Sequence, residues 1–397
     1  MLLILGLVIL RESRQGYATA YENRFSDWLA KNSEIQPVNA PLALIEINDE
    51  GLANTHPWPL PPIDYALFLR AGLIFQPSLL AIEPVLTWPV EMIDETASEN
   101  KKILHEQILR CPKLLLGSQL GFPSDPDLVP VLQSVPALHH VKGNPSKLSE
   151  FAIVEQQPLE ELRLAVPVGF TNLPLTESPV RGVPLVFRYC GQVVPSFVLQ
   201  SAMLWLQLTP EEVQVELGAF VKMGDTFRIP IDDSGVMKVN PNSQFTRMGL
   251  EDLLLLVSQI EAKHQPLVAP ESLTGKVLLL ARTDSEARTL LFPSGRNGSP
   301  GELFASALAT IQNQKFSRRA PLMVDLLIIL GDLALALCFY RLRAAGAIFT
   351  ALMVLPIYLM CAITLFSSTL IWVPVVLPFG LLAFALMFRL TSPPPQK

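Results

Sequence analysis

Four carboxylates stand near the ends of the first two predicted strands, where they could bind a ligand. The apolar runs Leu42–Ile47 and Ser78–Ile82 are typical of buried strands, and a predicted helix at about Ile63–Ala71 lies between them. This order predicts a βαβ-type unit with a parallel strand pair. Loops at the carboxyl ends of parallel strands meet at one edge, where ligands bind. The carboxylates near that edge are Glu46, Asp49, Asp64 and Glu83.

These carboxylates permit two interpretations. Carboxylates held close together resist ionisation until a positive partner arrives, so they could bind a cation or an amine. Alternatively, Asp49 belongs to the turn Asn48–Gly51, and Asp64 starts the helix that Gly72 ends. Backbone N–H groups would then satisfy both side chains.

Three aromatic residues flank a proline-rich loop that follows the first strand. Trp58, Tyr65 and Trp88 could line a site for an aromatic ligand, because aromatic rings supply a large contact area at low entropy cost. The alternative is that they pack this loop onto the domain. Both interpretations stay open.

Other reactive residue types form no recognisable site. Asp232–Gly235 resembles the start of a calcium loop but lacks its final glutamate and spacing, so we expect a turn. His139 and His140 have no third ligand nearby. Cys111 and Cys190 are isolated, and could form a disulfide or stay as two buried thiols. We expect no catalysis, no metal and no cofactor.

The remaining patterns predict a single mixed α+β domain, because helical and strand-like segments follow one another without a linker. Predicted strands lie at Lys113–Gly117 and Lys276–Ala281, with a hairpin-like pair at Phe227–Ile231 and Val236–Asn240. Predicted helices lie at Glu95–Leu109, Phe197–Leu206, Leu250–Ile260 and Glu302–Gln312.

Three apolar runs near the C-terminus have the length of membrane-spanning helices: Leu322–Tyr340, Ala344–Phe366 and Leu370–Phe388. Leu2–Leu10 is apolar but too short to span. It reads as the second half of an anchor whose first half precedes the start, or as a helix that continues amphipathically through Arg14 on the membrane surface.

The stretch Tyr17–Lys31 has the period of an amphipathic helix leaving the bilayer, with Tyr21, Phe25, Trp28 and Leu29 on its apolar face. We therefore divide the chain into an anchor (1–16), a large domain (17–319), three membrane helices (320–390) and a short cytoplasmic tail (391–397).

Charge excludes one class of partner and leaves the orientation open. The 36 acidic residues outnumber the 30 basic ones, which does not suit a nucleic acid. Arg341 and Arg343 in a short loop favour the cytoplasmic side for that loop, and therefore an external large domain. Lys315, Arg318 and Arg319 would then lie outside, against the rule.

Asp332 is the membrane residue of most interest, because a carboxylate midway along a spanning helix is costly. It could pair with a basic residue of a partner protein and couple the two. Alternatively it is protonated or hydrogen-bonded to Tyr358 or Thr364 within the bundle. Pro356, Pro374 and Pro378 should bend their helices.

Four stretches together resemble the CHASE2 domain, an extracytoplasmic sensory module of bacterial membrane receptors. Residues 42–72 are similar to its opening strand, acidic turn, Trp-Pro motif and first helix, and residues 77–86 to its second strand. Residues 180–203 resemble its Gly-x-x-Arg-x-x-Pro to Pro-Ser stretch, and residues 273–311 its closing strand and Pro-Gly helix. Three membrane helices directly afterward complete the resemblance.

This chain departs from the family pattern at several positions. Glu83 stands near a usual aspartate, Ala281-Arg282-Thr283 replaces a Gly-Ala/Ser-Thr segment, and Phe304 or Ala305 replaces a histidine. The aspartate that usually precedes Val180–Arg181 is absent, an aspartate of the following loop is replaced near Arg288–Thr289, and Glu302 stands where the family is apolar. The resemblance implies the fold rather than a particular ligand pocket.

The resemblance implies an outward-facing sensor in the bacterial inner membrane. The expected partners are the lipid bilayer, an unknown small ligand, a separate signalling or envelope protein contacted through the membrane helices, and a possible second copy of the chain. Two other hypotheses are a non-catalytic scaffold of the cell envelope, and a receptor whose effector has been lost or is encoded separately.

Overall fold

The computed structural model divides the chain into two compact units. It describes residues 2–33, 38–54, 56–88, 95–122, 136–174, 178–240, 243–262 and 272–391. The helical unit comprises Met1–Gln36 with Ser317–Lys397, and the α/β unit comprises Pro37–Phe316. Residues 17–36, which we assigned to the large domain, therefore belong to the helical unit, and most of the predicted tail lies outside the described residues.

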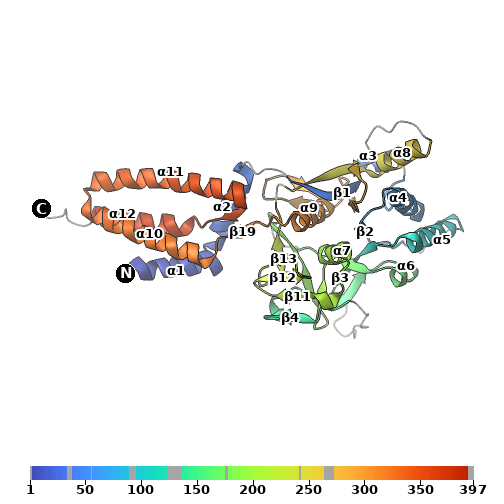
Figure 1. The fold of residues 1–397 in the computed structure, drawn as a ribbon, viewed down its shortest axis with the longest axis horizontal. Coiled ribbons are helices and arrows are strands. Elements are labelled where there is room, and N and C mark those ends of the chain that lie inside the picture. Colours follow the sequence, from blue (N-terminus) through green and yellow to red (C-terminus); the bar gives the residue numbers. More distant parts are fainter. Residues whose placement is uncertain are drawn as a thin grey trace. The chain divides into compact units, whose positions relative to one another are not determined.

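The helical unit is built from segments at both ends of the chain (Figure 1). Its helices are α1 (Leu2–Gln15), α2 (Thr19–Asn32), α10 (Leu322–Arg341), α11 (Ala344–Thr369) and α12 (Val376–Thr391). α12 packs against α1, α10 and α11. Among the described residues, α10 and α11 are long and apolar enough to cross a membrane.

Two predictions for this unit need correction. The third apolar run does not start as a helix, because Ile371–Trp372 forms strand β20, paired in parallel with β19 (Arg318–Arg319). Pro374 therefore precedes α12 instead of bending it, whereas Pro356 does lie inside α11. α1 continues through Arg14, as the second interpretation of the N-terminus required.

The α/β unit is organised around a mostly parallel sheet with the strand order β15-β1-β16-β2-β3-β6, and β7 also pairs with β3. The parallel strands are β1 (Asn39–Ile47), β2 (Leu79–Ile82), β3 (Leu114–Gly121), β7 (Val168–Phe170), β15 (Gln244–Gly249) and β16 (Val277–Arg282). β6 (Ile153–Gln156) is antiparallel to β3.

Helices cover both faces of this sheet, which explains why its central strands β2 and β16 are apolar and buried. Leu44 and Leu279 belong to one core cluster, with α7 (Phe197–Leu206) and α9 (Pro300–Asn313). Ile45 and Leu280 belong to the other, with helices on the opposite face. Those helices are α4 (Pro62–Ile74), α5 (Glu95–Arg110), α6 (Glu160–Ala165) and α8 (Leu250–Glu261).

Smaller sheets complete the α/β unit (Figure 1). One has the order β13-β12-β11-β4, with β4 (His140–Lys142), β11 (Val213–Glu216), β12 (Phe220–Met223) and β13 (Phe227–Pro230). Another has the order β10-β9-β5, with β5 (Glu150–Phe151), β9 (Val186–Tyr189) and β10 (Gln192–Pro195). The pairs are β14 (Val236–Lys238) with β8 (Gly182–Pro184), and β17 (Leu290–Leu291) with β18 (Asn297–Gly298).

The prediction that the first two strands pair directly is wrong. β1 and β2 are parallel and share the sheet, but β16 lies between them and pairs with both. The predicted hairpin around Asp232–Gly235 is also wrong, because β13 pairs with β12 and β14 pairs with β8. The strands β16 and β8, which displace the predicted pairing, come from distant parts of the sequence, whereas β12 directly precedes β13.

Two local predictions near the first strand also need correction. The expected turn at Asn48–Gly51 is the start of a short helix, α3 (Asp49–Asn54), whose Gly51 N–H donates to the Asn48 side chain over 2.8 Å. α4 continues past Gly72 to Ile74. Gly72 is needed for packing instead, since a Cβ there would lie 2.8 Å from Leu80.

The contact between α9 and β16 requires a residue without a side chain. A Cβ added to Gly301 would lie 2.2 Å from the Cβ of Ala281. We expect Gly301→Ala to destabilise the α/β unit by about 1–3 kcal/mol, because the helix must move away from the sheet. Chemical denaturation of the full chain in detergent measures this change.

A second substitution tests the cause. Ala281→Gly removes the opposing methyl group, so the double variant should be more stable than the sum of the two single effects predicts. Additive effects would contradict the close approach as the reason for Gly301.

Candidate functional site

The carboxyl ends of β1, β2 and β16 lie beside a small aromatic cavity. The cavity has a volume of about 180 Å³ and is lined by Trp58, Pro59, Tyr65, Val85, Thr87, Trp88 and Gln156. The structure thus places the three aromatic residues of the sequence analysis around one space. We call it the aromatic cavity.

Packing around the cavity holds two of its rings in place. The ring of Tyr65, on α4, meets the ring of Trp88 edge to face, with centroids 6.0 Å apart. The indole N–H of Trp88 donates to the carbonyl of Leu60 over 2.8 Å, which fixes the ring against the proline-rich loop. Both side chains are buried. Burial also raises the pKa of Tyr65, so its phenol stays neutral.

An arginine that the sequence analysis did not select completes this region. The guanidinium of Arg282, at the end of β16, lies over the Trp58 ring with its central carbon 4.3 Å from the centroid. Its Nε–H and Nη2–H groups donate to the two carboxylate oxygens of Asp284 over 2.5 and 2.8 Å. Because β16 is inserted between β1 and β2, Arg282 reaches an edge that its sequence position does not suggest.

Glu83, just after β2, is the carboxylate at this edge whose pKa is raised close to neutral pH. Burial raises its pKa to about 7, although the backbone N–H and the charge of Arg282 oppose the shift. The backbone N–H of Arg282 lies 3.5 Å from its Oε2 atom. The neighbouring strand needs Gly117 here, since a Cβ would lie 2.0 Å from the Glu83 carbonyl oxygen. Glu83 therefore changes charge close to neutral pH.

The other predicted carboxylates have partners of their own. Burial raises the pKa of Asp64, which pairs with the imidazole of His56 at 2.9 Å rather than with the backbone. Asp49 accepts hydrogen bonds from the N–H and hydroxyl of Ser285, and these bonds lower its pKa.

Glu46 lies in a separate ion-pair network on the edge of β1. Its carboxylate pairs with Arg247, which also pairs with Glu302 at the start of α9, and Glu302 pairs with Arg296 at 3.0 Å. The four carboxylates therefore each contact a different group of the protein. Among the described residues no group of three or more His, Cys, Asp or Glu side chains is placed to hold a metal ion.

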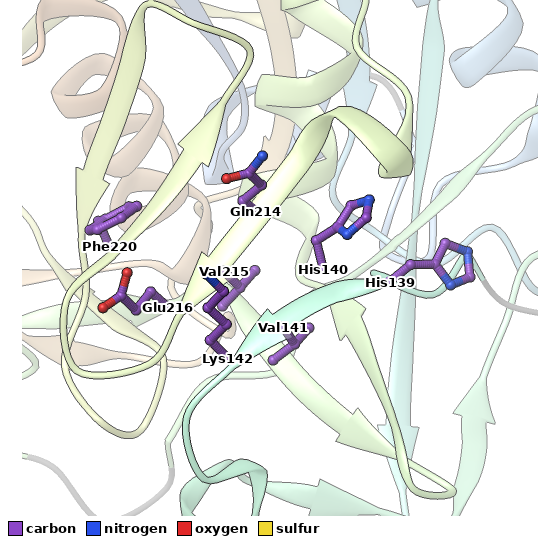
Figure 2. A pocket seen from close by; sticks show the side chains of 8 residues that line it. All are labelled: His139, His140, Val141, Lys142, Gln214, Val215, Glu216 and Phe220. Carbon is purple, nitrogen blue, oxygen red and sulfur yellow. The ribbon is translucent and has the colours of Figure 1, made fainter.

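A larger groove of about 390 Å³ lies over β4 and β11. Figure 2 shows His139 and His140 at one end of it, with Glu216 and Phe220 at the other. The imidazoles do not converge with the carboxylate, so this groove offers no focused set of polar groups. Cys111 and Cys190, the other residues left open, are both free thiols, and burial raises the pKa of Cys111 to about 11.

The helical unit contains a buried ion-pair cluster that the sequence analysis missed. Asp325, in the first turn of α10, is fully buried and pairs with Arg14 at 2.7 Å and Arg319 at 3.5 Å. Arg319 also donates to the Ser13 side chain over 2.5 Å. The sequence shows Arg318, Arg319 and Asp325 around the start of this apolar helix, but it does not show that Asp325 pairs with Arg14.

A second buried carboxylate belongs to the same cluster. Glu22, on α2, accepts hydrogen bonds from the backbone N–H groups of Val375 and Val376 over 2.8 and 3.0 Å. It thereby satisfies donors at the N-terminus of α12, where a carboxylate also meets a favourable helix dipole. Burial raises the pKa of Glu22, while these hydrogen bonds and Arg319 oppose the shift.

Asp332 differs from Asp325, although both lie on α10. Its Oδ2 atom is buried without a hydrogen-bond partner among the described residues. The predicted partners bond elsewhere: the Tyr358 hydroxyl donates to the Pro374 carbonyl, and the Thr364 hydroxyl donates to the Met360 carbonyl. Among the described residues no hydrogen bond joins Asp332 to Tyr358 or Thr364, so both interpretations of Asp332 stay predictions.

Comparison with known proteins gives one match. The CHASE2 domain family matches residues 2–339, which span both the α/β unit and part of the helical unit. No curated protein and no solved structure matches the chain.

Glu83 should make stability depend on pH. In the unfolded chain its pKa is ordinary, so between about pH 4.5 and 7 the unfolded state releases a proton that the folded state keeps. Stability therefore falls as pH rises through this window. Glu83→Gln lacks this titration. As pH rises from about 5 to 8, we expect its free energy of unfolding to rise by about 2 kcal/mol relative to that of the wild type, measured by denaturation of the full chain.

Glu160→Gln is the matched control, since the Glu160 side chain is 73% exposed. The free energy of unfolding of that variant should depend on pH as that of the wild type does. If Glu83→Gln shows the same pH dependence as the wild type, Glu83 does not titrate in this window.

The two aspartates of α10 should respond differently to the same substitution. Asp325→Asn leaves two part-buried guanidinium groups without their carboxylate and should lower the free energy of unfolding by about 3 kcal/mol. Asp332→Asn breaks no ion pair and should change stability by less than about 1 kcal/mol. Thermal unfolding of both variants in detergent compares them, and equal losses would contradict the assignment of the cluster.

Proposed function

The chain belongs to the CHASE2 domain family, and on this premise we propose that it is a membrane-bound sensor that relays the state of its α/β unit through its membrane helices to a separate partner protein. CHASE2 is a family of extracellular sensory domains. In this proposal α10, α11 and α12 cross the bacterial inner membrane, α1 anchors the N-terminal end, and the α/β unit faces the periplasm or exterior.

The aromatic cavity is the observation that carries the ligand part of the proposal. It combines aromatic walls with a few polar groups at the carboxyl edge of a parallel sheet, the usual place for a small ligand. Its volume of about 180 Å³ suits a single ring or a short amine. Glu83 and Arg282 beside it would respond to a charged ligand, because each changes the electrostatic environment of the other.

The chain itself supplies the route from this region to the membrane helices. β16 leads from the sheet into the segment of Arg282, and α9 then returns across the sheet. Only a few residues separate α9 from Arg319, which pairs with Asp325 at the start of α10. We therefore propose that the signal passes through the short segment between α9 and Arg319.

Asp332 is our candidate for contact with the partner. Asp332 is half-buried on α10, and because a carboxylate is costly in a bilayer, a basic or amide side chain on a partner helix would stabilise it. A scaffold of the cell envelope could use the same contact, but its assembly would not depend on the aromatic cavity. This difference separates the two functions.

The test is quantitative co-purification of membrane partners with the full chain from detergent. We expect Asp332→Asn to lower recovery of a specific partner about tenfold, the effect of losing one contact of about 1.4 kcal/mol. Trp58→Leu should also change that recovery, although Trp58 lies in the α/β unit, because a sensor couples its cavity to its output.

Two substitutions serve as controls. Thr364→Val removes a hydroxyl of α11 that bonds only within its own helix, and Phe122→Leu alters an aromatic side chain of the α/β unit that is 67% exposed and outside the cavity. Both should leave recovery unchanged. Loss with Asp332→Asn but not with Trp58→Leu would favour the scaffold, and no loss with either would contradict both functions.

A further inference from the structure

Helix α2 turns its polar residues inward. Its buried positions are Glu22, Ser26 and Leu29, and Ser33 just beyond its end is buried as well. These residues recur every three or four positions and therefore share one face of the helix. Three of the four are polar, which is the reverse of what an amphipathic helix packed on a protein in water presents to its core.

The opposite face of α2 carries large aromatic residues. Tyr21, Arg24, Trp28 and Lys31 follow one another at the same spacing, and Tyr17 precedes them in the turn before the helix. The exposed fractions are 95% for Tyr17, 63% for Tyr21 and 42% for Trp28. The structure divides the predicted apolar face, because Leu29 and, in part, Phe25 pack inward while Tyr21 and Trp28 lie outward.

An outward row of aromatic and basic residues is favourable at a membrane surface. Tyrosine and tryptophan combine an apolar ring with a polar group, and they concentrate where a bilayer meets water. Basic side chains next to them can reach lipid phosphates. Arg24 and Lys31 supply this charge, and Arg24 lies over the Tyr21 ring at 5.9 Å.

The inward contacts of α2 place it at one end of the apolar helices. Leu29 clusters with Phe366 near the end of α11, and with Leu370 and Trp372 in the segment before α12. Glu22 binds the first backbone N–H groups of α12. If α10 and α11 span the bilayer, this end of the helices lies at its surface, and α2 lies there with it.

We propose that α2 lies in the membrane–water interface, with Tyr17, Tyr21 and Trp28 in the headgroup layer and Arg24 and Lys31 on lipid phosphates. The occupant of this face is the phospholipid headgroup layer itself. The inference rests on the proposed membrane location of α10 and α11. The buried polar face of α2 then serves the ion-pair cluster, while its aromatic face fixes the depth of that cluster.

The depth of Trp28 tests this placement. The full chain is reconstituted in nanodiscs of phosphatidylcholine and phosphatidylglycerol whose acyl chains carry bromine near the headgroup or near the methyl end. The difference in tryptophan quenching between the wild type and Trp28→Phe reports on Trp28 alone. We expect bromine near the headgroup to quench it about twofold more than deep bromine, and aqueous iodide to quench it little.

Trp58→Phe, in the α/β unit, is the matched control, and it should leave quenching by brominated lipid unchanged. Quenching of Trp28 by iodide and not by bromine would place it in water, and quenching by neither would mean that protein covers it; either result overturns the proposal. Retention of the chain in membranes after alkaline carbonate extraction tests the spanning helices separately, because it does not depend on Trp28.

Discussion

The insertion of β16 between β1 and β2 is the constraint on which the rest of the structure depends. It pairs a strand from near residue 280 with two strands from before residue 83, so the sheet cannot close until most of the α/β unit has been made. It brings Arg282 to Trp58 and Glu83. It also provides the surface on which α9 packs through Gly301. The same strand, β16, therefore carries Arg282 at the edge of the sheet and supports α9, the helix that precedes the helical unit in the sequence.

Charge is handled differently in the two units. At the edge of the sheet, Arg282 pairs with Asp284, Glu83 forms no ion pair among the described residues, and burial raises the pKa of Glu83. In the helical unit, Asp325 is bound by two arginines from different segments. An underpaired group can respond to its surroundings, whereas a carboxylate paired with two arginines holds their segments together, because removing the carboxylate leaves both guanidinium charges without it. In the proposed sensor, the Glu83 arrangement would suit detection of a charged ligand, and the Asp325 arrangement would suit holding segments together.

Local patterns predicted most of the regular elements. β1, α7, α8 and β16 lie close to their predicted ranges because each is a strongly apolar or periodic segment bounded by turn residues. The family resemblance came from the same segments, and the match over residues 2–339 confirms it. Trp58, Tyr65 and Trp88 were selected from residue type alone, and the structure places them around one cavity.

What sequence patterns could not supply was pairing over long separations. The position of β16, the partner of β14 and the ion pair of Arg14 with Asp325 each join residues far apart in the chain. A period in the sequence shows that a residue faces something, but not what it faces. Tyr21 and Leu29 show this most clearly, since both were predicted on one apolar face of α2, and the structure buries Leu29 but leaves Tyr21 exposed.

The ion-pair cluster also changes how basic residues should be counted when a membrane orientation is inferred. Lys/Arg bias acts through charge that is available to the membrane surface. Arg319 pairs with Asp325 and lies over the Trp372 ring, and Arg14 shares the same carboxylate, so both are partly neutralised within the protein. Arg341 and Arg343, at the opposite end of α10, are exposed and form no ion pair among the described residues. Counting only available charge therefore weakens the objection to an external α/β unit that Arg319 raised, and it does so from geometry that is independent of the family match.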